Sequence, residues 1–228
     1  MQKTIYTLDV DNYAPEITAL TRPLLWAYAD KIQAELYIIT RRQWPQMPPV
    51  FEKLQIGQLM TDRGDDWAIY IDADALVHPD FFDPTEHIAK SVVLHNGVDM
   101  AGNRWRYDKY FRRDSRHIGS CNWFTVASDW CAADLWAPLH DMTFKEALAN
   151  IFPTQNELNT VITREHLIDD YILSRNIARF GLHCTTMSEV LNRLGRSNES
   201  YLFHEYTLPI PEKVVKLKEM IEKWGCHV

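Results

Sequence analysis

The first third of the chain alternates between short apolar runs and longer segments with helical spacing of apolar positions. The apolar runs predict strands at residues 4–8, 36–40 and 67–71. The segments with helical spacing predict helices at residues 15–33 and 51–60. Pro23 lies inside the first helix and predicts a kink or a restart after Thr21. This alternation is typical of an α/β fold with a mainly parallel central sheet flanked by helices.

The rest of the chain has a less regular pattern. It predicts strands at residues 98–101 and 122–127, and helices at 129–136, 144–150, 170–180 and 212–224. The last helix carries one clear apolar stripe, formed by Val214, Leu217, Ile221 and Trp224. No repeat and no linker interrupts the pattern, so we expect a single domain over residues 1–228.

Composition and charge narrow the class of protein. The formal net charge of −7 disfavours bulk binding of nucleic acid, and no apolar run is long enough for a membrane span. The first residues lack the basic and apolar regions of a signal peptide. The four cysteines form no C-x-x-C pair, which disfavours a zinc ribbon or a thioredoxin-type site. We therefore expect reduced thiols and a cytoplasmic location, in the host cell if the gene is viral.

Two carboxylates follow the third predicted strand. Asp72 and Asp74 are separated only by Ala73, directly after the apolar run 67–71. Carboxylate oxygens are the ligands preferred by Mg²⁺ and Mn²⁺, which share their coordination with substrate phosphates. A solvated turn is the alternative, because D-x-D alone is common. The buried strand before it favours a metal site, since a buried strand has no structural use for two uncompensated charges.

The order of motifs resembles that of metal-dependent glycosyltransferases of the GT-A fold, above all the glycogenin-like and galactosyltransferase-like families. The matching segments are residues 7–13, 24–40, 51–54, 72–74, 119–126, 169–173 and 203–204. This resemblance implies one GT-A (Rossmann-like) domain. It would have a nucleotide-binding half at about 1–80, an acceptor-side half at about 95–210 and a C-terminal helix at 211–228.

The resemblance also implies roles for individual residues. Metal ligands for Mn²⁺ or Mg²⁺ would be Asp72, Asp74 and His204. Residues holding the nucleotide and donor sugar, most simply a UDP-sugar, would be Thr7, Leu8, Asp9, Tyr13, Lys53, Asp72 and Ala73. The acceptor, a glycan or another hydroxyl compound, would meet Asn122, Trp123, Arg104 and Trp105. The catalytic carboxylates would be Asp169 and Asp170.

The sequence leaves the use of these last two carboxylates open. Either could serve as a general base in an inverting reaction or orient the acceptor in a retaining one. Neighbours on a helix point about 100° apart, so we expect one of them to face the site.

The chain departs from the family pattern in two places. Position 124 is Phe where the family often has Gly. The Gly-x-Lys-Pro-Trp that often follows the late histidine is absent, and Lys213 or Lys216 is the candidate to replace its lysine.

Residues 104–116 combine six basic residues with four aromatic ones. Such a segment suits a surface loop, an acceptor-binding lid, or contact with an anionic acceptor such as a phosphorylated glycan or a nucleic-acid base.

Two other classes of function are compatible with parts of the sequence, a phosphatase and a non-catalytic binding protein. A haloacid dehalogenase-like phosphatase would use Asp9 and Asp11 as its nucleophile motif and Asp169 and Asp170 as its late acidic motif. That interpretation needs a long insertion between the motifs and leaves residues 67–74 without a role. The second alternative is a transferase-like fold that binds a nucleotide sugar or a partner without catalysis. The intact D-x-D motif disfavours this alternative.

Overall fold

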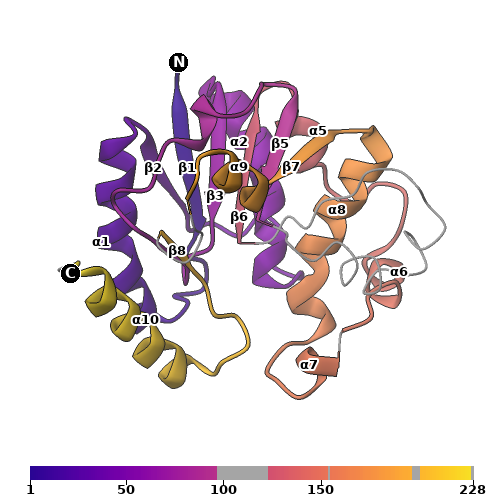
Figure 1. Cartoon of the computed structure of the whole chain (residues 1–228). Coiled ribbons are helices and arrows are strands. Elements are labelled where there is room, and N and C mark those ends of the chain that lie inside the picture. Colours follow the sequence, from indigo (N-terminus) through magenta and orange to yellow (C-terminus); the bar gives the residue numbers. More distant parts are fainter. Residues whose placement is uncertain (97–122, 154, 197–200, 227–228) are drawn as a thin grey trace.

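The computed structural model describes residues 1–96, 123–153, 155–196 and 201–226 (Figure 1). The predicted strand at 98–101, the basic aromatic loop at 104–116 and the acceptor candidates Arg104, Trp105 and Asn122 lie outside these residues. The described part is an α/β unit with a central six-stranded sheet flanked by helices, as the alternating pattern predicts.

The sheet has the strand order β2-β1-β3-β6-β5-β7. Its strands are β1 (Lys3–Leu8), β2 (Glu35–Ile39), β3 (Trp67–Ile71), β5 (Val92–His95), β6 (Phe124–Ser128) and β7 (His183–Thr186). β1 runs parallel to both β2 and β3, and β5 runs parallel to β7. Only β6 is antiparallel to its neighbours within this sheet. The prediction of a mainly parallel sheet is therefore confirmed.

Side chains alternate across the strands and bury both faces of the sheet. Tyr6 and Tyr70 belong to one apolar cluster, which they share with α2 (Ile56–Arg63), α5 (Ala132–Leu135) and α8 (Ile168–Phe180). Ile5 and Ile69 point to the other cluster, with α1 (Pro15–Lys31) and α9 (Met187–Arg193). Because both faces are covered, β3 is buried at every position, which explains its continuous apolar run.

A third cluster joins the last helix to the first. α10 (Ile210–Trp224) lies beside α1, and Leu217 and Ile221 pack against Ile17 and Leu24 (Figure 1). The predicted apolar stripe of the C-terminal helix thus has its partner. None of the described helices has the length and apolar character needed to cross a membrane.

The helix at 15–31 continues through Pro23, without the predicted restart. A proline in a helix interior costs about 3 kcal/mol. Burial of Leu24, Leu25 and Tyr28 on the same helix offsets this cost.

Several elements differ from the sequence prediction. The helix expected at 129–136 is reduced to α5, because residues 128–131 form a turn closed by the Cys131 amide and the Ser128 carbonyl at 3.0 Å. The segment expected as helix 51–60 begins as a 3₁₀ helix, η1 (Pro49–Gln55), and continues as α2. The remaining short helices of the described residues are η2 (Pro84–Glu86), α6 (Phe144–Ala149), α7 (Gln155–Leu158) and η3 (Arg164–Leu167).

Candidate functional site

A cavity of about 890 Å³ lies at the carboxyl ends of β1 and β3. Leu8 and Asp72 line it from these two strand ends. The other walls come from η1, from residues 157–170 and from residues 204–213. Open parallel sheets bind ligands at this edge, so the cavity lies where the sequence predicts a site.

The turn after β3 is fixed on both sides. The amide of Ala75 donates to the carbonyl of Asp72 at 3.0 Å, and the hydroxyl of Thr21 donates to the carbonyl of Ala73 at 2.6 Å. The amide of Asp72 donates to the carbonyl of Trp123 at 2.9 Å, which ties the turn to the start of β6. These bonds orient both carboxylates of the D-x-D motif toward the cavity.

A two-stranded ribbon brings His204 to this turn. β4 (Leu76–Val77) pairs antiparallel with β8 (Leu202–Phe203), with Leu76 opposite Phe203. His204 therefore follows β8 at the level where β4 begins. One ligand atom each of Asp72, Asp74 and His204 lies within 4.8 Å of the others. Among the described residues this is the group of acidic and histidine side chains that could hold a metal ion.

Lys213 completes the surroundings of Asp74. Its Nζ lies 2.5 Å from Asp74 Oδ2, while His204 Nε2 lies 3.1 Å from Asp74 Oδ1. Burial alone would raise the pKa of Asp74, but His204 and Lys213 outweigh burial and hold the pKa below its usual range. Lys216 instead pairs with Glu219 on the surface. Of the two lysine candidates, Lys213 is therefore the one at the site.

Lys53 lines the cavity and is buried between two carboxylates. Its Nζ is 2.5 Å from Asp169 Oδ2 and 2.9 Å from Asp72 Oδ1, and it lies 4.7 Å from the centre of the Tyr70 ring. Burial would lower the pKa of Lys53, but Asp169 and Asp72 raise it, so the amine stays charged. Burial raises the pKa of Asp169 to about 6, against the opposing charge of Lys53.

Asp169 and Asp170 both line the cavity, although helical neighbours diverge. They occupy the first turn of α8, whose amino end favours negative charge. Trp123 also lines the cavity, with its ring centre 5.2 Å from that of His204. Trp123 and His204, which are far apart in the sequence, thus lie next to each other at the cavity.

The predicted nucleoside residues divide into two groups. Leu8, Tyr13 and Ala73 line the cavity. Partial burial, and then the charges of Asp74 and Asp72, raise the pKa of Tyr13 above its ordinary value, so the phenol stays neutral. Thr7 is buried and Asp9 forms an ion pair with Arg22, and neither lines the cavity.

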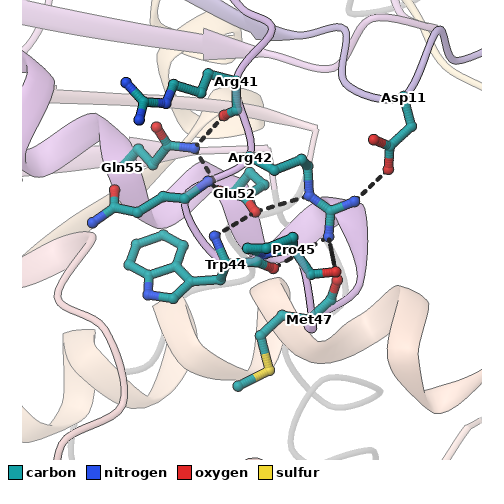
Figure 2. A network of polar contacts seen from close by, with 9 residues as sticks. Asp11, Arg41, Arg42, Trp44, Pro45, Met47, Glu52 and Gln55 are labelled. Carbon is teal, nitrogen blue, oxygen red and sulfur yellow. Dashed lines mark hydrogen bonds and ion pairs between the residues drawn. The ribbon is translucent and has the colours of Figure 1, made fainter.

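A polar network missed by the sequence prediction is centred on Arg42, in the loop that leads to the cavity-lining residues 48–50 (Figure 2). The Arg42 guanidinium donates to fully buried Glu52 at 2.9 Å, pairs with Asp11, and donates to the carbonyl of Met47. Glu52 also accepts from the amides of Gln43 and Trp44, at 2.9 Å each, and from the Gln55 side chain at 2.6 Å. Arg42 thereby joins the loop after β1 to the loop after β2.

Replacing Arg42 by methionine should loosen the adjoining cavity wall at 48–50. The change removes the charged partner of Glu52, and we expect a loss of about 1–3 kcal/mol in the free energy of unfolding. Urea unfolding followed by circular dichroism measures it. Arg193→Met is the control, because, within the described residues, its side chain forms a long surface contact of 3.4 Å with the carbonyl of His87. Equal stability of the two variants would contradict a role for the network.

The phosphatase interpretation requires the motif of Asp9 and Asp11 and the motif of Asp169 and Asp170 to meet in one site. In the structure Asp9 and Asp11 are paired with Arg22 and Arg42 outside the cavity lining, whereas Asp169 and Asp170 line it. The described metal-competent group is a different one. The geometry therefore favours the D-x-D interpretation.

At the level of sequence, no protein-family profile and no curated protein matches the chain. At the level of structure, the chain is similar to a glycosyltransferase involved in the glycosylation of the major capsid of PBCV-1, known from a crystal structure. The TM-score is 0.53 at 11% identity, over 96% of this chain and 100% of that one. The two chains share a fold. That likeness supports the expected α/β architecture. The Asp-Asp-His group at the cavity separately fits the metal site expected at the D-x-D motif.

Proposed function

We propose that the protein is a metal-dependent glycosyltransferase that moves a sugar from a nucleoside diphosphate sugar, a UDP-sugar in the first instance, to a hydroxyl acceptor. The observation that carries this proposal is the meeting of Asp72, Asp74 and His204 in a cavity of a glycosyltransferase-like fold. The cavity volume suits a nucleotide sugar, since small-molecule sites span roughly 300–1,000 Å³.

The donor set fits a hard divalent cation. Two carboxylates and one imidazole offer the ligand types found in Mn²⁺ and Mg²⁺ sites, and they leave positions for phosphate oxygens. Asp72, Asp74 and His204 would hold the ion. When bound, it would supply Lewis-acid stabilisation of the negative charge that develops on the leaving diphosphate.

Residues of the chain itself would do the remaining work. Lys213 would offer its ammonium group to a phosphate at the amino end of α10. Tyr13 and Leu8 would enclose the nucleoside at the strand edge. Asp169, held by Lys53, would present its carboxylate to the sugar or to the acceptor hydroxyl. In an inverting reaction it would act as general base on the acceptor hydroxyl, and in a retaining reaction it would orient that hydroxyl.

A thermal-shift experiment tests the proposal. UDP should raise the melting temperature when Mn²⁺ or Mg²⁺ is present and not in EDTA, and GDP serves as the comparison nucleotide. A panel of nucleotide sugars should then reveal slow metal-dependent hydrolysis of one donor. Equal stabilisation by UDP with and without the metal would contradict the proposal. So would hydrolysis of a generic phosphate ester that Asp9→Asn abolishes and Asp74→Asn spares.

The pH dependence of turnover should follow Asp169. With a pKa of about 6, its carboxylate is ionised at neutral pH and becomes protonated as the pH falls below about 6. The protonated form cannot act as a base, and protonation weakens the ion pair with Lys53. Below the pKa the turnover rate should therefore fall tenfold for each pH unit. A pH–rate profile between pH 5 and 8 measures this. In Asp169→Asn the acid limb should be missing from the residual rate, and its persistence would assign the limb to another group.

A further inference from the structure

Part of the cavity lining is apolar and comes from the loops that follow β1 and β2. Leu8, Val10 and Tyr13 line the cavity from β1 and the loop after it, and residues 48–50 line it from the loop after β2. These two parts of the chain are neighbours, because η1, which begins at Pro49, packs against β1. A nucleobase placed among these side chains would bury apolar area on both partners.

The loop after β2 is closed by a buried ion pair. Arg42 lies near its start, and the guanidinium donates to the fully buried Glu52 carboxylate at 2.9 Å (Figure 2). The same guanidinium donates to the carbonyl of Met47, directly before the lining residues 48–50. Two of these three lining residues are prolines, whose rings fix φ. The segment 48–50 is therefore held on both sides and is stiff in between.

The guanidinium of Arg42 also reaches the loop after β1. It pairs with Asp11, two residues before Tyr13. Asp11 lies in a tight turn, in which the amide of Tyr13 donates to the carbonyl of Val10 at 3.3 Å. One side chain thus joins the turn that carries Tyr13 to the loop that carries residues 48–50.

We propose that Tyr13 and residues 48–50 enclose the nucleoside of the donor, and that Arg42 is the positioning residue that sets the distance between them. Arg42 is outside the cavity lining formed by the described residues, so it acts through the two loops. Loops that are already ordered cost less free energy when a ligand binds. This inference rests on the proposed glycosyltransferase function. It gives these loops the role expected for Asp9, which pairs with Arg22 instead.

Titration calorimetry on the full chain in Mn²⁺ tests the inference with two ligands. UDP and inorganic pyrophosphate share the diphosphate, and only UDP carries a nucleoside. Asp11→Asn is a mild change, because asparagine tolerates the positive φ of 58° at this position. It should weaken UDP binding about threefold, and Arg42→Met, which releases both loops, should weaken it about tenfold. Both variants should bind pyrophosphate within about twofold of the unmodified protein.

Arg63→Met is the matched control. Like Arg42, Arg63 pairs with two carboxylates, Glu35 at 2.5 Å and Asp65 at 3.4 Å, but these residues lie outside the cavity lining. Its loss should lower the free energy of unfolding. It should leave the affinity for UDP unchanged at a temperature at which every variant is folded.

Unchanged UDP affinity in both Asp11→Asn and Arg42→Met would overturn the positioning role. Equal losses for UDP and pyrophosphate, or an equal loss of UDP affinity in Arg63→Met, would overturn it as well. Failure of pyrophosphate to bind the unmodified protein would contradict a metal-held diphosphate beside a loop-held nucleoside. If UDP binding to the unmodified protein does not depend on Mn²⁺, the proposed function itself fails. If that dependence is present and the variants behave as the unmodified protein, only the positioning role is wrong.

Discussion

Replacing Asp74 by asparagine should abolish the metal-dependent stabilisation by UDP and lower nucleotide-sugar turnover by at least about a hundredfold. Asp74 has two partners in the structure, the Lys213 ammonium group at 2.5 Å and the His204 imidazole at 3.1 Å. Its oxygens are therefore the natural site for a divalent ion, which would compete with Lys213 for them. The amide in the variant has no charge and one fewer acceptor atom, so neither the ion nor the ammonium group keeps its partner.

The measurement is a Mn²⁺ titration of the UDP-induced shift in melting temperature, followed by hydrolysis assays at saturating Mn²⁺. Asp80→Asn is the matched control, because its side chain is 79% exposed and pairs only loosely with Lys31 at 3.7 Å. It should behave as the unmodified protein. A variant at Asp74 that kept the UDP shift at unchanged Mn²⁺ concentrations would remove Asp74 from the ligand set.

Replacing Lys53 by methionine is expected to destabilise the fold by about 3–5 kcal/mol. Lys53 is 3% exposed and neutralises Asp169 and Asp72 from between them. Without it, the carboxylates of Asp169 and Asp72 lose the cation that both pair with in the structure. Asp169→Asn should then cost less in the Lys53→Met background than alone, since the amide removes one of the uncompensated charges.

Urea unfolding of the two single variants and of the double variant measures this coupling. Lys90→Met is the control, since Lys90 also joins two carboxylates, Asp66 and Asp129, but on the surface. Its loss should change stability only slightly, because surface ion pairs are screened by solvent. Additive losses in the double variant would show that Lys53 and Asp169 do not act as a pair.

The D-x-D site could be anticipated because its decisive signal is local. An apolar run followed directly by Asp72 and Asp74 can be recognised in the sequence without knowledge of the fold. His204 could be named only by resemblance, because two-residue strands such as β4 and β8 leave no periodic trace. The sequence could not show which of Lys213 and Lys216 lies at the site, since they are three residues apart on one amphipathic helix. They differ in their partners in the folded chain, Asp74 for Lys213 and Glu219 for Lys216.

Other features leave no apolar run, helical periodicity or motif in the sequence. Strand β7 consists of His183–Thr186, partly exposed at the sheet edge, so it lacks the apolar run that reveals central strands. Glu157, on the short helix α7, and Tyr206, after β8, are 49 residues apart and come together only in the folded chain. The Arg42 network likewise depends on backbone carbonyls, which every residue possesses.

Because β4 pairs with β8, the site can form only late in protein synthesis. Asp74 and His204 are 130 residues apart, and Asp74 and Lys213 are 139 apart. At translation rates of roughly 5–20 residues per second, a nascent chain carries an incomplete cluster for many seconds after its D-x-D turn has left the ribosome. During that interval β4 lacks its partner β8, and Asp74 lacks both His204 and Lys213. A ribosome-bound chain that ends before residue 202 should therefore show no metal-dependent retention on immobilised UDP, and retention should begin only once residues 202–213 have emerged.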